Sequence, residues 1–179
     1  AFGVDVQNRN SSLNTCLDNY LVRPAGVSAD RFAAPLTLSP GFCALSILFS
    51  DWNRSGKRDL RISNDQYYYL PPGEEQLWHL APEPALYQPE EGWQSVNIWG
   101  MGIATHDITG DGYPDSFLTS MMANKLVTLG DDPLAGPRYV DMAGPAGVTA
   151  PRPYAGSDRD KVSAAWHAQF VNLNNDGLP

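Results

Sequence analysis

A nine-residue pattern of oxygen-bearing side chains recurs along this chain and constrains its fold more than any other feature. The clearest copy is DITGDGYPD, in which oxygen side chains at alternate positions precede a glycine and a final carboxylate: Asp107, Thr109, Asp111, Gly112 and Asp115. Alternate side chains converge on one point only if the backbone curls tightly, and glycine at the sixth position permits the positive φ of such a curl. The copy predicts a compact loop with its oxygen atoms turned inward.

Two further segments follow the same pattern. In DWNRSGKRD the corresponding residues are Asp51, Asn53, Ser55, Gly56 and Asp59. In NLNNDGLP they are Asn172, Asn174, Asp176 and Gly177, and the sequence ends before the ninth position. We call these segments the Asp51, Asp107 and Asn172 loops. Their starts lie 56 and 65 residues apart, which indicates an internal repeat of roughly 60 residues.

The chemistry of the pattern is that of a site for a hard cation. In the Asp107 loop the side chains and the backbone carbonyl of Tyr113, at the seventh position, form an all-oxygen cage, and Ca²⁺ prefers about six to eight oxygen ligands. Asp-Gly and Ser-Gly dipeptides also form hairpin turns without any metal, so a plain turn stays open. An EF-hand does not fit, because it needs flanking helices and a glutamate at position 12, where this chain has Ile62 or Leu118.

Short apolar or alternating runs surround the loops and predict strands rather than helices. The expected strands span residues 41–49, 59–63, 66–70, 76–80, 96–105, 115–120, 125–129, 138–142 and 162–171. They predict an all-β fold of β-propeller blades with about four antiparallel strands each. The chain forms one repeat domain, 1–179, with units at 1–40 (degenerate), 41–85, 86–150 and 151–179 (truncated). Because propellers have about 4 to 8 blades, we expect an incomplete propeller, closed by remaining blades or by a partner chain.

The composition limits which binding partners and which cellular compartment are expected for this protein. Acidic residues (20) outnumber basic ones (12), for a net charge of −8, so nucleic acid is not an expected partner, since binding phosphates needs clustered cations. No apolar run approaches the roughly 20 residues of a membrane span. Cys16 and Cys43 can form one disulfide, or they are two buried thiols. A start at Ala1 without methionine and calcium-type loops favour an exported protein, extracellular or periplasmic.

Catalytic patterns are absent from the sequence, and we expect no enzyme. There is no nucleophile elbow, no zinc-protease motif and no phosphate-binding glycine loop. His106 adjoins Asp107, but neighbours in a strand point to opposite faces. His167 lies in an apolar run and is expected in the core. Large aromatic side chains are expected to pack between blades: Trp78, Trp93, Trp99 and Trp166.

Four segments of the sequence resemble a known family of repeats. GMGIATHDITGDGYPD, SAAWHAQFVNLNNDGLP and the two AGV tripeptides (25–27 and 146–148) resemble the FG-GAP and VCBS repeats of the integrin α-subunit propeller. They are most similar to the bacterial relatives of cartilage acidic protein, the ASPIC/UnbV group. The resemblance implies an exported, seven-bladed, calcium-bearing propeller that serves adhesion or assembly rather than catalysis.

The resemblance also implies a set of calcium ligands. These are Asp51, Asn53, Ser55, Asp59, Asp107, Thr109, Asp111 and Asp115. Asn172, Asn174 and Asp176 join them if the next residue is Asp. From the loop pattern, the seventh-position residues Lys57 and Tyr113 are also expected as ligands. The family pattern has a carboxylate where this chain has Ser55, Thr109 and Asn172. The Asp107 loop keeps three carboxylates and the Asp51 loop two, so we expect the Asp107 loop to bind calcium best, because more ligand charge generally gives tighter binding.

The expected function is that of a calcium-binding extracytoplasmic propeller module that mediates protein–protein interaction, with a structural metal. One alternative is an accessory subunit docked in a larger complex. Another is the non-catalytic part of a propeller enzyme or of a carbohydrate-binding protein.

Overall fold

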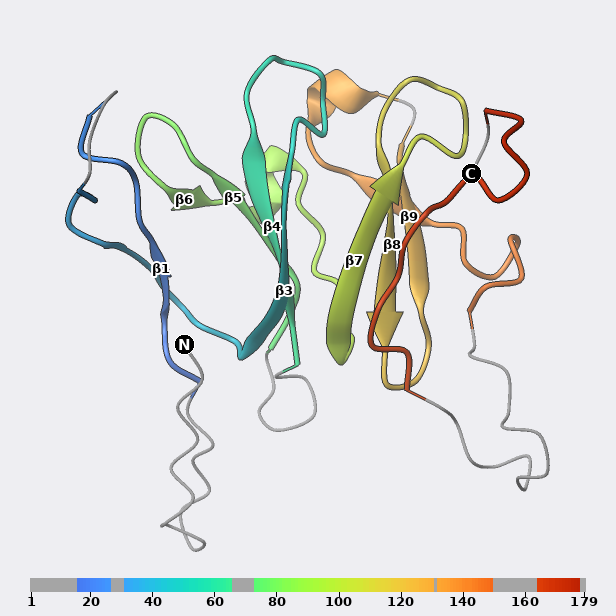
Figure 1. Ribbon diagram of the computed structural model, residues 1–179, viewed down its shortest axis with the longest axis horizontal. Helices are drawn as coiled ribbons and strands as arrows, with labels where there is room; N and C mark the ends of the chain where they lie inside the picture. The colour runs from blue at the N-terminus through green and yellow to red at the C-terminus, as the bar shows by residue number, and fades with distance from the viewer. Residues whose placement is uncertain (1–15, 27–30, 66–72, 131, 150–163, 178–179) are drawn as a thin grey trace, which may run out of the picture.

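The computed structural model describes residues 16–26, 31–65, 73–130, 132–149 and 164–177 of the 179-residue chain, and within them the fold is built from antiparallel sheets (Figure 1). A two-stranded sheet pairs β1 (Asn19–Leu21) with β2 (Leu36–Leu38). A four-stranded sheet has the order β3 (Ala44–Ser50), β4 (Asp59–Asn64), β5 (Gln76–His79) and β6 (Ala85–Leu86). A second has the order β7 (Gly100–His106), β8 (Asp115–Ser120), β9 (Lys125–Leu129) and β10 (Tyr139–Asp141). The short 3₁₀ helices are η2 (Pro89–Glu91) and η3 (Pro133–Ala135). The all-β prediction is confirmed, and ring closure stays a prediction.

The two four-stranded sheets are copies of each other, strand for strand. In the first sheet Ser50 pairs with Asp59 across the end of the β3–β4 hairpin, and in the second His106 pairs with Asp115 at the same place. Both inner hairpins also carry a register shift near the start of the first strand. The internal repeat is therefore present in the hydrogen-bonding register as well as in the sequence.

The sheets stack face against face, with β7 packed against β3 (Figure 1). The core between them is aromatic and aliphatic: Trp52, Leu77, Tyr87, Trp93 and Leu129, with Tyr113 and Tyr139 at its margin. Arg61 also lies there, 2% exposed, with its guanidinium carbon 5.6 Å from the Trp93 ring centroid and 4.9 Å from that of Tyr139. Since these rings stack around the cation, they stabilise it by cation–π attraction.

A second core lies on the opposite face of the first four-stranded sheet. It joins Leu38 of β2 to Leu60, Ile62 and Trp78. Successive side chains of β4 alternate between the two cores, as strand geometry requires, so every residue of β4 is buried. A strand buried on both faces is the mark of a sheet in the middle of a stack.

The expected strands are confirmed where a partner strand exists. Those at 59–63, 76–80, 115–120 and 125–129 match β4, β5, β8 and β9 closely. The strand expected over 66–70 lies outside the described residues. The strand expected over 162–171 is not formed in its described part, 164–171, where no ladder is present. A backbone hydrogen bond from Ala165 N to Ser120 O, at 3.3 Å, joins this part to β8.

The degenerate unit expected at 1–40 contains the two-stranded sheet, and its residues 1–15 lie outside the described part of the chain. Cys16 and Cys43 form a disulfide with a Cα–Cα distance of 4.9 Å, which settles the pairing that the sequence left open. The bond ties the segment before β1 to the residue before β3. In the described residues no helix has the length and apolar character needed to cross a membrane.

Candidate metal-binding loops

The three loops share one backbone conformation. Left-handed φ values occur at the fourth and sixth positions of each: Arg54 (57°) and Gly56 (80°), Gly110 (73°) and Gly112 (90°), Asn175 (60°) and Gly177 (91°). The glycine at the sixth position was expected in this conformation, and the left-handed fourth position was not. The Asp51 and Asp107 loops connect β3 to β4 and β7 to β8 at the same end of the stack (Figure 1).

In the Asp107 loop the carboxylates bond the backbone amides around them. Asp107 accepts from the amide of Gly110 through Oδ1 at 2.8 Å and from that of Gly112 through Oδ2 at 2.9 Å. Asp111 Oδ1 accepts from the amide of Tyr113 at 2.7 Å. These bonds hold the curl closed, which is the geometry that an Asx turn gives to a short loop.

The ninth residue of this loop, Asp115, is fully buried. Its Oδ2 accepts from the amides of Ile108 at 2.8 Å and Thr109 at 2.9 Å, which aims the carboxylate into the loop. Its Oδ1 is also buried, and no donor among the described residues reaches it. Because a buried carboxylate oxygen without a partner carries a large desolvation cost, this atom marks a position where a positively charged ligand would be stabilised.

The Asp51 loop repeats the arrangement at its first position. Asp51 accepts from the amides of Ser55 and Gly56, each at 2.8 Å. Asn53 Oδ1 also accepts from the Ser55 amide, at 3.2 Å, and Ser55 Oγ accepts from the amide of Lys57 at 3.3 Å. The side chains of Asp51, Asn53 and Ser55 are therefore turned into the loop.

The ninth residue of the Asp51 loop is used differently. Asp59 Oδ2 accepts from Trp52 Nε1 at 2.8 Å and from the Tyr87 hydroxyl at 2.7 Å. Burial, followed by the hydrogen bond to Asp59, raises the pKa of Tyr87 well above its usual value. The Asp59 carboxylate thus fixes two rings of the core between the sheets, whereas the Asp115 carboxylate bonds only loop amides among the described residues.

The Asn172 loop has weaker internal bonding. The amide of Asp176 donates to Asn172 Oδ1 at 3.2 Å and to Asn174 Oδ1 at 3.4 Å. Asn174 Nδ2 donates to Asp176 Oδ2 at 2.7 Å. The loop is built as the other two are, but it contains a single carboxylate.

The acidic side chains of the loops are not gathered around one point. Within the described residues no group of three or more His, Cys, Asp or Glu side chains is placed to hold a metal ion. The carboxylates of Asp107 and Asp111 bond amides instead. Convergence of the predicted ligands on one cation is therefore an expectation that the structure does not test.

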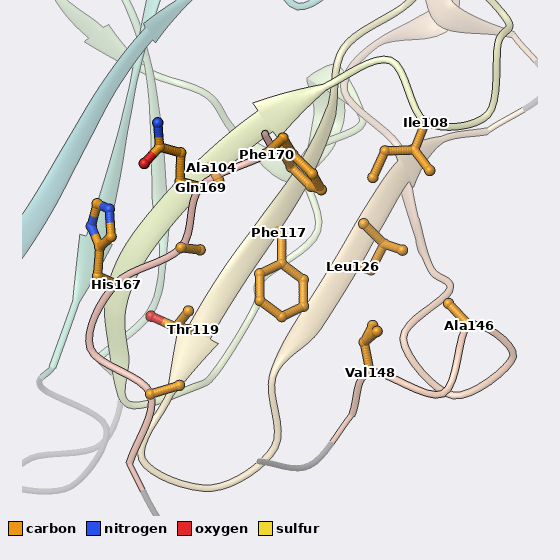
Figure 2. A pocket seen from close by; sticks show the side chains of 12 residues that line it. Ala104, Ile108, Phe117, Thr119, Leu126, Ala146, Val148, His167, Gln169 and Phe170 are labelled. Carbon is orange, nitrogen blue, oxygen red and sulfur yellow. The ribbon is translucent and has the colours of Figure 1, made fainter. Parts of the chain in front are cut away.

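An apolar recess of about 500 Å³ on the free face of the second four-stranded sheet was not expected from the sequence (Figure 2). Its walls come from β7, β8, β9 and the segment after them, and they include Ile108, Phe117, Leu126, Ala146 and Phe170. By register, the first three correspond to Trp52, Arg61 and Leu77, which the second sheet covers in the first repeat. The recess is therefore the same inter-sheet position, one repeat further on.

The three histidines have different surroundings in the described part of the chain. His79 Nε2 lies 2.7 Å from Glu91 Oε1, and its ring stacks on Tyr87 with centroids 3.5 Å apart. His106 is exposed at the end of β7. His167 is exposed at the rim of the recess, so the prediction that it lies in the core is wrong. The prediction failed because a run of apolar residues is buried only where another element covers it.

The tryptophans follow the same rule. Trp78 (4% exposed) and Trp93 (5%) pack between adjacent sheets as expected, and Trp99 is partly buried. Trp166 is 66% exposed, because in the described residues no sheet packs against its side of the chain.

Comparison with family models, with curated proteins and with solved structures found no match for this chain.

Proposed function

We propose that this protein is a calcium-stabilised β-propeller-type repeat module whose exposed sheet face binds another protein surface, with the metal in a structural role. The observation that carries the calcium proposal is the carboxylate of Asp115. It is fully buried, it is aimed into an oxygen-rich loop, and its Oδ1 has no donor among the described residues.

Asp115 Oδ1 would be stabilised more by a divalent cation than by a further hydrogen bond. The loop amides of Ile108 and Thr109 already serve Oδ2, while Asp107 and Asp111 supply two more carboxylates within the same turn. A hard cation that binds oxygen at variable coordination number satisfies such a set, and Ca²⁺ tolerates the irregular geometry better than Mg²⁺ does. The cation would stabilise the loop and would take no part in a reaction.

The two loops differ in what the ninth residue does without metal. Asp59 is satisfied by Trp52 and Tyr87, so the Asp51 loop is held to the core even when no cation binds. In the Asp107 loop, the carboxylate of Asp115 is held only by the amides of Ile108 and Thr109 among the described residues. We therefore expect calcium to matter most in the Asp107 loop, in agreement with its higher ligand charge.

The protein-binding part of the proposal rests on the apolar recess. Ile108 and Val148 are hydrophobic side chains with 44% and 36% of their surface exposed, and they line a recess whose counterpart in the first repeat is filled. Exposed apolar surface of this kind is typical of interaction sites. A module of a larger assembly, built around such a face, is favoured over an isolated domain.

Thermal unfolding with calcium and then with excess chelator tests the metal proposal. A ligand that binds only the folded state stabilises it by about 2.7 kcal/mol at a hundredfold excess over Kd, so we expect a clear rise in midpoint. Asp107→Asn should abolish most of the rise, and Asp132→Asn, which removes an equal charge from the cap of η3, should not. An unchanged midpoint at millimolar calcium would contradict the proposal.

A further inference from the structure

Arg54, in the Asp51 loop, lies against the neighbouring Asp107 loop. A Cβ built on Gly112 would be 3.0 Å from the Arg54 Nη1 and 3.4 Å from its Cζ, so the guanidinium covers the backbone at the sixth position of that loop. The same Cζ lies 6.0 Å from the ring centroid of Tyr113. The amide of Gly112 is the donor to Asp107 Oδ2. The first repeat therefore places a positive charge directly on the Asp107 loop of the second repeat.

The backbone of Arg54 is unfavourable for an arginine. Its φ is 57°, in the left-handed region, where the equivalent residue of the Asp107 loop is Gly110. Glycine adopts this region without penalty and residues with a Cβ do not. Strain at a single position is often found where the side chain has a role, and the contact with the neighbouring loop supplies one here.

Among the described residues, the charge of Arg54 is not neutralised by a direct partner. No ion pair joins it to a carboxylate of the described residues, and the side chain is exposed. It therefore does not block the oxygens of Asp107, Asp111 or Asp115. What it supplies is positive potential beside the turn that carries Asp107, Asp111 and Asp115, which stabilises these negative charges when no cation is bound and opposes the approach of a cation.

We propose that Arg54 is a counter-charge across the repeat boundary that stabilises the calcium-free Asp107 loop and weakens its calcium affinity. This inference rests on the proposed calcium site. By linkage, a group that stabilises the metal-free state relative to the bound state raises the dissociation constant by the same factor. The first repeat thereby sets the calcium concentration at which the second repeat fills.

Isothermal calorimetry of calcium binding to the whole chain tests this assignment, with Asp107→Asn used to identify the signal of this loop. Arg54→Gln removes the charge and keeps most of the side chain, and it should lower Kd about threefold, the size expected for one exposed charge interaction. Arg54→Lys keeps the charge and should bind as the wild type does. Arg58→Gln, an equal charge change at an exposed site of the same loop, is the matched control and should also leave Kd unchanged.

Salt provides a second readout. The difference between Arg54→Gln and the wild type should shrink between about 0.02 M and about 0.5 M salt, because the Debye length falls severalfold over that range. An unchanged Kd in Arg54→Gln would overturn the inference and leave the calcium site intact. A weaker Kd in both Arg54→Gln and Arg54→Lys would also overturn it, since the contact would then preorganise the loop. If the wild type shows no binding that Asp107→Asn removes, the proposed function itself fails.

Discussion

Glu75 and Asn124 occupy the same place in consecutive sheets and make the same hydrogen bond. Glu75 Oε1 accepts from the amide of Asn64, and Asn124 Oδ1 accepts from the amide of Ser120, each at 3.0 Å. Each acceptor directly precedes the third strand of its sheet and bonds the last residue of the second strand. In the first repeat, however, the acceptor is a carboxyl group, and it is fully buried.

The pH dependence of stability should report this difference. Burial raises the pKa of Glu75 to about 7, against the opposing influence of the Arg61 charge. Since the folded value lies above the unfolded one, the contribution of Glu75 to stability is fully present below the unfolded pKa and is lost as pH rises through 7. The free energy of unfolding should fall by about 3 kcal/mol from this group between about pH 4 and about pH 8.

Glu75→Gln isolates that contribution, because glutamine still accepts a hydrogen bond and does not ionise. Chemical denaturation at a series of pH values should show a shallower fall for this variant than for the wild type. Glu90→Gln changes the same group at an exposed position of η2 and should leave the slope as it is. Parallel profiles for Glu75→Gln and the wild type would show that Glu75 titrates normally.

Tyr87→Phe should destabilise the fold whether or not calcium is present. It removes the hydroxyl donor to Asp59, and hydrogen bonds to charged groups contribute about 1.5–3 kcal/mol. Tyr20→Phe, at a position 58% exposed, is the control and should be neutral. A double-mutant cycle with Asp59→Asn should give a coupling energy of at least about 0.5 kcal/mol; additive effects would mean that the two groups act separately.

Equivalent positions of the two loops should respond differently to truncation. Trp52 is 3% exposed in the core between the sheets, whereas its counterpart Ile108 is 44% exposed beside the recess. Trp52→Ala should cost about 3–5 kcal/mol, and Ile108→Ala less than about 1 kcal/mol, as measured by urea denaturation. An equally large loss for Ile108→Ala would mean that the recess is closed in the isolated chain.

Gly100→Ala should be damaging for a steric reason. The added methyl group would overlap the Ser63 hydroxyl and the Glu75 carboxyl group across the boundary between the sheets, and such overpacking typically costs about 1–3 kcal/mol. Gly144→Ala meets no atom within 4 Å and has no left-handed φ, so its midpoint should stay near that of the wild type. A tolerated Gly100→Ala would show that the sheets separate easily.

The sequence predicted those features that residue type controls directly. Glycine at the sixth loop position adopts the positive φ that was expected of it, as in Gly112, and the ninth-position carboxylates Asp59 and Asp115 begin strands. The left-handed φ of Arg54 could not be predicted, because arginine gives no preference for that conformation. It follows from the shared loop geometry and from the contact with Gly112.

Features that depend on residues far apart in the chain could not be predicted from the sequence either. Alternation along β4 shows that Arg61 and Leu60 face opposite sides, but only the fold brings Trp93 and Tyr139 to the guanidinium. Trp166 and Trp93 were both predicted to lie in the core because they are large aromatic side chains. Trp166 is exposed, because burial needs a neighbouring sheet. The calcium ligands and the ring of blades remain predictions.

The most direct test of the calcium site is crystallography of the protein grown with calcium, read by anomalous difference density. The account predicts a peak in the Asp107 loop, about 2.3–2.6 Å from Asp115 Oδ1, with the carboxylates of Asp107 and Asp111 turned toward it. A loop that shows no peak at saturating calcium, with Asp107 still bonded to the amides of Gly110 and Gly112 as here, would contradict the account and leave these loops as metal-free turns.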